Sequence, residues 1–115
     1  MATWTARCVH CVTQLADGRV ATGGMDKTVK LWDVATGTCV ATWTGHTDYV
    51  HCITQLADGR VVTGGSDGTM YLWDVAAGTC AGTWTGHTSY VQCVTELADG
   101  RIVTGSWDNT VKIWE

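Results

Sequence analysis

His46, Thr63 and Asp67 combine a base, a hydroxyl and a carboxylate, which are the residue types of a hydrolytic triad. The same three types return 41 residues later at the corresponding positions of a second group. Catalysis would call for one distinct nucleophile, and none stands out in this chain. Because the group recurs in each complete unit, we expect it to hold the structure together, and we predict that the protein is not an enzyme.

Cys8 and Cys11 flank His10 in a Cys-x-x-Cys pair that could supply zinc ligands. A zinc site of this kind needs further ligands at matching spacing. On a strand, positions 8 and 11 point to opposite faces because side chains alternate with a period of two. Cys11 also has counterparts in later copies, Cys52 and Cys93, that lack a Cys-x-x-Cys partner. We therefore expect no metal and no cofactor.

These residues belong to a repeat with a period of 41 residues. VHCVTQLADGR at 9–19 returns as VHCITQLADGR at 50–60 and as VQCVTELADGR at 91–101. The first two copies are identical at 31 of their 41 positions. Internal repetition of this length is typical of solenoids and propellers. Copies this similar indicate recent duplication or design.

Each unit predicts four short β-strands. Runs rich in β-forming residues alternate with turns such as Asp58-Gly59 and Asp67-Gly68, where glycine supplies the positive φ of a tight hairpin. In the second unit the expected strands are 49–55, 60–63, 69–73 and 79–84. No sustained helical period is present. Four strands in about 41 residues predict an all-β fold built from antiparallel four-stranded propeller blades.

Paired motifs recur at the same period. Trp-Asp stands at 32–33 and 73–74, and Trp-Glu at 114–115, where third strands end; Gly-His at 45–46 and 86–87 precedes first strands. The combination of Gly-His, a turn Asp and Trp-Asp resembles the WD-repeat β-propeller family over essentially the whole chain. The resemblance implies a single three-blade segment, residues 1–115, with blades at about 8–44, 49–85 and 90–115.

The resemblance also implies a hydrogen-bonded tetrad in each blade, formed by a loop His, a second-strand hydroxyl, a turn Asp and a third-strand Trp. A closed network of this kind would satisfy buried polar groups. The implied tetrads are His46, Thr63, Asp67 and Trp73, and His87, Thr104, Asp108 and Trp114. The first unit has Thr22, Asp26 and Trp32 but no His. We expect that tetrad to be incomplete, with Asp26 relying on water.

Trp107 is a candidate anchor for a partner. In the WD family its position, and the residue that opens the first strand, line the face where partners dock. The positions implied to bind a protein or peptide are Trp107, Tyr49, Tyr90, Met25 and Ser66. The alternative is that Trp107 packs on a neighbouring blade. His10, His51 and Gln92 occupy equivalent places on the first strands, where they would face the central channel or a neighbouring blade; we favour a simple polar lining over an ion-binding ring.

Three blades do not close a ring, since propellers typically have about 4 to 8. One apolar blade face would be exposed at each end, and such patches mark interfaces. ATWT at 2–5 matches the fourth strand at 41–44, so we expect residues 1–5 to complete the last blade of a neighbouring chain. Head-to-tail contacts of this kind form rings if the rotation between chains closes. We favour a homodimer with six blades over a trimer with nine.

Bulk properties exclude several classes of function. The 115 residues carry a net charge of −4 without a basic cluster, so we expect no nucleic-acid partner. No apolar run approaches about 18 residues, which argues against a membrane span or a signal peptide. This leaves the cytoplasm as the expected location. Five of the six cysteines recur at repeat positions, and we expect free thiols in a reducing compartment.

Two functions remain open. The favoured interpretation is a self-assembling propeller scaffold without catalysis, with three blades per chain closing into a ring between chains. The alternative is a natural interaction module that docks a protein or peptide on its top face.

Overall fold

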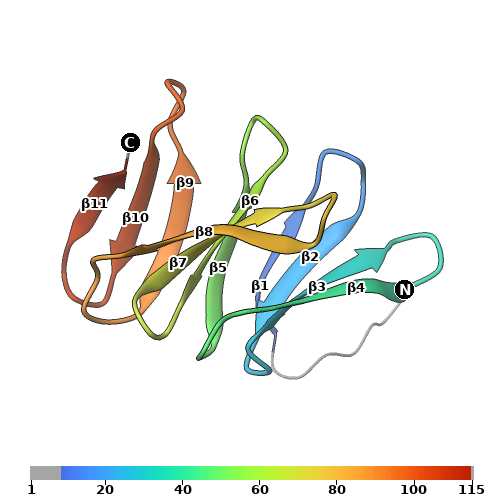
Figure 1. Cartoon of the computed structure of the whole chain (residues 1–115), viewed down its shortest axis with the longest axis horizontal. Coiled ribbons are helices and arrows are strands. Elements are labelled where there is room, and N and C mark those ends of the chain that lie inside the picture. The colour runs from blue at the N-terminus through green and yellow to red at the C-terminus, as the bar shows by residue number, and fades with distance from the viewer. Residues whose placement is uncertain (1–8, 115) are drawn as a thin grey trace.

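The computed structural model describes residues 9–114, which form three antiparallel sheets (Figure 1). Each sheet orders its strands as they follow in the chain. The first sheet contains β1 (Val9–Gln14), β2 (Val20–Gly24), β3 (Thr28–Asp33) and β4 (Thr38–Thr44). The second contains β5 (Val50–Gln55), β6 (Val61–Gly65), β7 (Thr69–Asp74) and β8 (Thr79–Thr85), and the third β9 (Val91–Glu96), β10 (Ile102–Ser106) and β11 (Val111–Trp114). The predicted all-β antiparallel fold is confirmed.

The hairpin between the first two strands of each sheet follows from the Leu-Ala-Asp-Gly sequence. In the first copy the Leu15 amide donates to the Arg19 carbonyl over 2.8 Å, and the Gly18 amide donates to the Leu15 carbonyl over 2.9 Å. Gly18 has φ of 92°, a region that side chains disfavour and glycine reaches freely. Asp17 pairs with Arg19 at 2.7 Å across the turn. The same arrangement returns in both later copies.

The turn before each third strand needs a left-handed residue at one repeat position. Gly68 and Asn109 fill it with φ of 79° and 69°, and these residue types tolerate that conformation. Lys27 occupies the same position in the first copy with φ of 67°. A lysine there is strained, because a Cβ atom disfavours the left-handed region.

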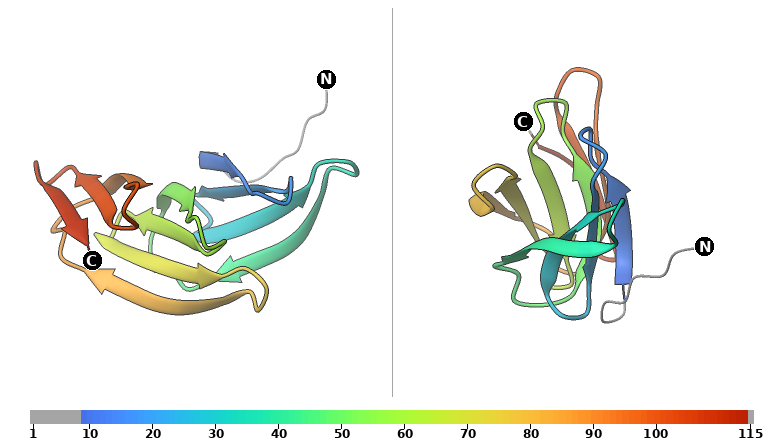
Figure 2. Two further views of the ribbon diagram at one scale, coloured as in Figure 1. Left: turned by 90° about the horizontal axis from the view of Figure 1, so that it is seen from above. Right: turned by 90° about the vertical axis from the view of Figure 1, so that its right-hand side faces the viewer.

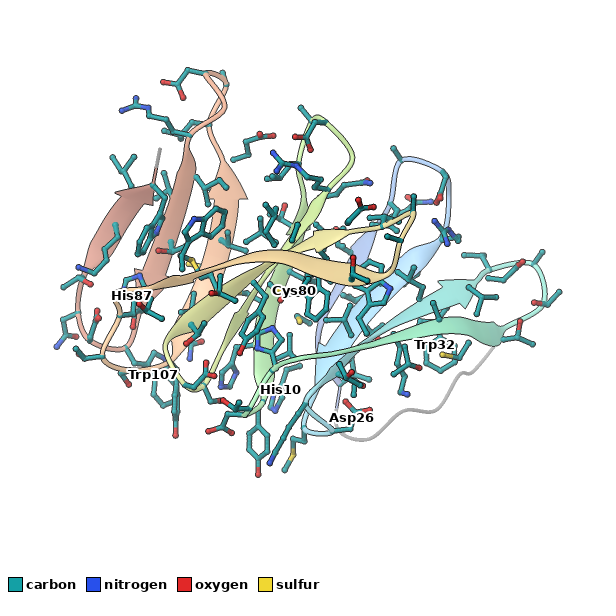
Figure 3. All side chains as sticks on the ribbon, viewed as in Figure 1. His10, Asp26, Trp32, Cys80, His87 and Trp107 are labelled. Carbon is teal, nitrogen blue, oxygen red and sulfur yellow. The ribbon has the colours of Figure 1, made fainter. Side chains whose placement is uncertain are left out.

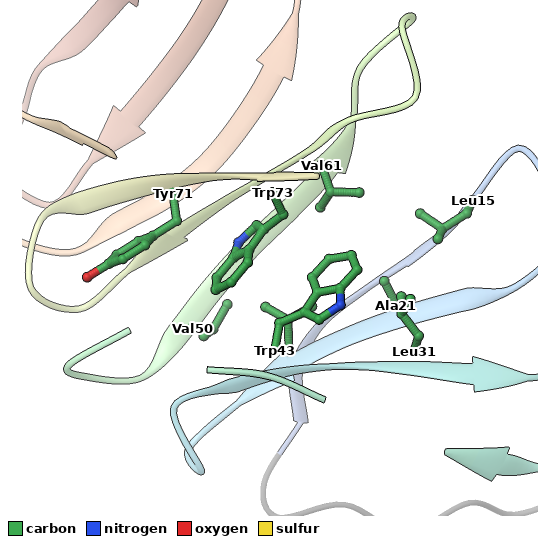
Figure 4. Packing of buried hydrophobic residues seen from close by; sticks show 9 residues of the cluster. Leu15, Ala21, Leu31, Trp43, Val50, Val61, Tyr71 and Trp73 are labelled. Atoms are coloured by element: carbon green, nitrogen blue, oxygen red, sulfur yellow. The ribbon is translucent and has the colours of Figure 1, made fainter. Parts of the chain in front are cut away.

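The sheets stack face to face, with the apolar core between them. Trp43 of β4 stacks on Trp73 of β7 with ring centroids 5.5 Å apart, beside the fully buried Val50 and Val61 (Figure 4). A second cluster joins the second sheet to the third and includes the buried Met70. Stability therefore depends on contacts between neighbouring blades, as expected for repeat architectures.

The three sheets follow one another along the molecule as an arc, with β1 beside β5 and β5 beside β9 (Figure 2). Within residues 9–114 the arc is not closed into a ring. The expected exchange of residues 1–5 falls outside the described residues and stays a prediction. Residues 9–114 also contain no helix of the length and apolarity that crossing a membrane demands.

Candidate functional site

The third sheet contains a complete four-residue network. The Trp114 indole N–H donates to Thr104 Oγ1 over 2.9 Å, and Thr104 Oγ1 lies 2.7 Å from His87 Nε2. His87 Nδ1 lies 2.9 Å from Asp108 Oδ2. Since the indole can only donate, the Thr104 hydroxyl is free to donate to Nε2, and the ring then carries its proton on Nδ1. Hydrogen bonds from Thr110, His87 and the Thr88 amide keep the pKa of the Asp108 carboxyl well below its usual value.

The second sheet repeats only part of this network. The Trp73 indole donates to Thr63 Oγ1 over 2.8 Å, and Thr63 Oγ1 lies 2.6 Å from His46 Nε2. Asp67 Oδ2 instead accepts the Thr47 hydroxyl over 2.7 Å. The buried His46 Nδ1 has no hydrogen-bond partner within the described residues. The expected tetrad is therefore open between His46 and Asp67, and one hydroxyl has taken the place of the imidazole.

The environment of His46 keeps its ring neutral. Burial lowers its pKa from 6.5 to about 4, and the nearby charge of Asp67 opposes this fall only in part. A protonated ring loses its hydration on burial, and a hydrogen bond from Nδ1 to an acceptor would offset that cost. His46 Nδ1 makes no such bond within the described residues, so the neutral ring is favoured.

The first sheet shows how a blade is held where no loop His is available in the sequence. The Trp32 indole donates to Thr22 Oγ1 over 2.9 Å, so the inner half of the network is present. Asp26 caps the next turn by accepting from the Thr28 amide over 3.0 Å. Its other oxygen lies 3.9 Å from the Lys30 ammonium. Lys30 is thus the charged neighbour of Asp26, and the expectation that Asp26 relies on water stays a prediction.

The buried hydroxyls explain why these groups are poorly suited to catalysis. Thr63 and Thr104 are both 0% exposed, and each oxygen already accepts an indole N–H. A nucleophile must reach its substrate, whereas these oxygens lie inside a blade interface. The arrangement ties a loop, a second strand and a third strand together.

A row of rings follows the edge of the sheets where the first strands begin. Trp107 contacts Tyr90 with centroids 4.6 Å apart, Tyr90 contacts His51 at 5.1 Å, and His51 contacts His10 at 5.0 Å. His10 stacks in turn on Tyr49 at 6.1 Å. Trp107 and His10 both lie along the lower edge of Figure 3. We call these five residues the aromatic rim.

Exposure on the aromatic rim is greatest at its third-blade end. Trp107 is 61% exposed and Tyr90 36%. Trp107 packs on Tyr90 of its own blade, and its amide donates to the Tyr90 carbonyl over 3.0 Å, so packing on a neighbouring blade is not what holds it. Met25 is half-buried. Ser66 is buried and lies 2.6 Å from His51 Nε2, so it is not available as a binding position.

Residues 9–114 contain no group of three or more His, Cys, Asp or Glu residues that could hold an ion. Burial raises the pKa of the Cys11 thiol to about 12, which makes it a poor source of thiolate. Its proposed partner Cys8 lies outside the described residues. Gln92 is a half-buried counterpart of His10 and His51 on β9.

Comparison with known proteins identifies the repeat. Residues 2–33, 37–74 and 78–115 match the family described as WD domain, G-beta repeat. This chain belongs to the WD-repeat family. The second match begins just before β4 and ends with β7, and the third begins just before β8 and includes β11, so both of these WD repeats start on the last strand of one blade and reach the third strand of the next.

Similar proteins share single stretches of the chain. The Lissencephaly-1 homolog of Dictyostelium discoideum is 54% identical over 33 residues, which are 29% of this chain and 8% of that protein. Periodic tryptophan protein 2 of Arabidopsis thaliana is 49% identical over 43 residues, 36% of this chain and 5% of that protein. The matched stretch thus spans less than a tenth of the length of either relative.

A solved structure shows the same fold. The WD40 β-propeller domain of Doa1 superimposes with a TM-score of 0.82 and 33% identity, covering 90% of this chain and 36% of that one. The prediction of a WD-repeat propeller fold is confirmed. Residues of the present chain correspond to an arc of such a propeller.

The outer face of the third WD blade exposes side chains that the other blades bury. Val29, Met70 and Val111 occupy one repeat position, and they are 0%, 0% and 73% exposed. Two residues further along the strand, on the same face, the exposed Ile113 (55%) corresponds to Leu72, which is buried at 8%. In each of the first two blades, the next blade packs on this face. No blade packs on the same face of the third blade within residues 9–114.

The opposite end mirrors this pattern. Val9, Val50 and Val91 share one repeat position, and they are 48%, 0% and 0% exposed. Val12 is 64% exposed on the same strand. The chain therefore presents two different apolar surfaces, which we call the Val9 face and the Val111 face. The repeat period alone could have located both, because it identifies each exposed residue with a buried counterpart.

Proposed function

We propose that this chain is a non-catalytic WD-repeat scaffold whose Val9 and Val111 faces associate between copies, so that three-blade units close into a propeller ring. One observation carries the proposal: positions buried at both internal interfaces are exposed at the two ends of the arc. Exposed apolar surface of this kind favours burial, because each large side chain removed from water contributes about 1.5–3 kcal/mol.

Two chains would supply six blades and three chains nine, and six lies within the usual range of about 4 to 8 blades. The two faces differ, so their contact is head-to-tail and closes only if the rotation per chain fits. We favour the dimer for this reason. The thiols of Cys11 and Cys52, each in contact with a backbone carbonyl, suit a reducing compartment, and we propose the cytoplasm.

Light scattering on the purified chain tests the proposal. We expect twice the chain mass of 12.3 kDa at micromolar concentration, and a monomer throughout that range would contradict it. Val111→Lys should release monomers, because it places a charge in the interface. Val40→Lys is the matched control. Val40 is 51% exposed, and its repeat counterpart Ala81 is also exposed although the third blade packs on the second, so this position does not lie in an interface between blades.

A second candidate function is docking of a peptide with a basic side chain on the aromatic rim. Trp107 is 61% exposed and already aligned by Tyr90, and aromatic faces attract cations. Burial and the neighbouring His10 lower the pKa of His51, and the negative charge of Asp48 opposes this shift. A negative charge therefore lies next to the aromatic rim. The chain as a whole carries a net charge of −4.

Titration with paired peptides separates this candidate from the first. We expect saturable binding of a lysine- and arginine-containing peptide, and its loss in Trp107→Ala with unchanged urea unfolding. Met25→Ala, at the same repeat position in the first blade, is the control. Equal binding of an acidic peptide of the same length would contradict recognition by charge.

A further inference from the structure

We infer that the Val111 face receives β1 of a second copy in the register that the internal repeat defines, with Val9 of the second copy seated over Gly105. The inference rests on the proposed self-association and specifies its interface. Three kinds of contact occur at both internal blade interfaces, between residues at the same repeat positions. For each kind, one partner residue lacks its counterpart on the first blade and the other lacks its counterpart on the third blade.

The first contact is a hollow at a second-strand glycine. A Cβ atom on Gly23 would lie 2.4 Å from Val50 Cγ1, and one on Gly64 would lie 2.6 Å from Val91 Cγ1. These valines therefore occupy the space that a side chain would need. At Gly105 the space meets only the Sγ atom of Cys93, at 3.0 Å, within the described residues.

The repeat counterpart of the two seated valines is Val9. It is 48% exposed, whereas Val50 and Val91 are fully buried. A free valine thus lies at one end of the chain and an unfilled glycine hollow, at Gly105, lies at the other. Close packing makes such a fit selective, because a gap forfeits contacts and an extra methyl clashes.

The second contact is a thiol that approaches the carbonyl beside the seated valine. Cys11 Sγ lies 3.9 Å from the Val50 carbonyl oxygen, and Cys52 Sγ lies 3.5 Å from that of Val91. The third member of this series is Cys93, which is an exposed free thiol. In the inferred register its acceptor is the Val9 carbonyl of a second copy.

The third contact joins the hairpin turns. The Ala16 amide donates to Gln55 Oε1 over 2.7 Å, and the Ala57 amide donates to Glu96 Oε1 over 2.8 Å. The next donor in the series is the amide of Ala98. The matching acceptor is the exposed Gln14, which has no preceding blade within residues 9–114.

Other pairings of the two faces fail on these contacts. A like-with-like contact would set Val9 against its own copy and leave the hollow at Gly105 empty. A slip of one residue along the strand would move Val9 away from Gly105 and leave the hollow unfilled, because the other inter-blade contacts seat a valine directly over the glycine. Only the head-to-tail register satisfies all three series together.

A bump-and-hole experiment tests the register by light scattering and sedimentation. Gly105→Val should weaken association about tenfold or more, since it fills the hollow that Val9 needs. The change is tolerable within the chain because its one close contact, Cys93, is exposed and can rotate away. Gly82→Val is the matched control, because a Cβ atom there meets nothing within 4 Å.

The compensating change is Val9→Gly, which should weaken the wild-type interface and restore association when combined with Gly105→Val. An independent pair probes the turn contact: Gln14→Glu should preserve association, as Glu96 serves the same role, and Gln14→Leu should weaken it. Urea unfolding of each variant confirms that the blades remain folded.

The outcomes distinguish the two proposals. Loss with Gly105→Val and recovery in the double variant establish the register. If the Gly105→Val variant forms an oligomer of the same mass and strength as the wild type, the proposed register is wrong, although the chain still self-associates. A wild-type chain that stays monomeric at every concentration overturns self-association, and the register with it.

Discussion

Acid should destabilise this protein well above the pH at which carboxylates titrate, because of the unpaired imidazole in its second blade. The pKa of His46 is about 4 in the folded chain and 6.5 in its ordinary, exposed state. Between these pH values, His46 is protonated in the unfolded chain and neutral in the folded chain. The free energy of unfolding is therefore undiminished above about pH 6.5 and falls as the pH drops from 6.5 towards 4.

The size of the effect follows from the two pKa values. Each unit of pH within the window costs about 1.4 kcal/mol per proton, so lowering the pH from 7.5 to 5.0 should reduce the free energy of unfolding by about 2 kcal/mol. Asp108, whose carboxyl pKa is lowered, acts in a different window: its stabilisation is lost only as the pH falls below the unfolded carboxyl value of 3.8. At pH 5.0 the loss therefore reports on histidine.

Urea unfolding followed by tryptophan fluorescence measures this loss at a fixed protein concentration. His46→Gln removes the titrating group and keeps a polar atom near Thr63, so it should flatten the dependence between pH 7.5 and 5.0 by about 2 kcal/mol. The pKa of His51 is also lowered by burial, and its smaller share should remain in the variant. A His46→Gln curve that keeps the full wild-type slope would refute the neutral, unpaired state of His46.

Three further changes test the blade interfaces, each by urea unfolding. Thr63→Val leaves a buried indole donor and the His46 ring without a partner and should lower the free energy of unfolding by about 3 kcal/mol; a loss under about 1 kcal/mol would contradict the network. Lys27→Asn places at φ of 67° the residue type that the third copy uses and should raise the free energy of unfolding by about 0.5–1 kcal/mol, and no gain would argue against strain there. Gly23→Ala sets a Cβ atom 2.4 Å from Val50 Cγ1 and should cost about 1–3 kcal/mol, while Gly82→Ala should not measurably disturb packing; equal effects would deny the close approach.

The blade could be predicted from the sequence because its signals are local. Asp-Gly turns and runs of β-forming residues set the strand limits of the second unit to within one or two residues. The largest deviation is β6, which extends through Gly64 and Gly65 beyond the expected end at 63. Paired glycines are typical of turns, but here the strand continues because Val91 of the next blade must approach the backbone. That requirement lies in another repeat.

The tetrads show where sequence reasoning reached its limit. All four residue types are present in both complete copies, yet His87 reaches Asp108 whereas His46 does not reach Asp67. The difference depends on which nearby group donates to the carboxylate, and in the second blade the Thr47 hydroxyl donates to Asp67 Oδ2. Such competition between nearby donors is decided by tenths of an ångström, and residue types alone do not contain that information.

Repetition also changes what exposure means in this chain. Val29 and Val111 are the same residue type at the same repeat position, and one is fully buried while the other is 73% exposed. Their difference reflects that, within residues 9–114, a further blade packs on Val29 and none packs on Val111, and it does not reflect a preference of the residue. Every duplication of a blade copies both halves of its interface, so an arc of blades necessarily ends in one face of each kind. In the proposed assembly, complementary faces therefore need no separate selection for binding, because the Gly105 hollow and the exposed Val9 correspond to the two halves of the interface between the internal blades.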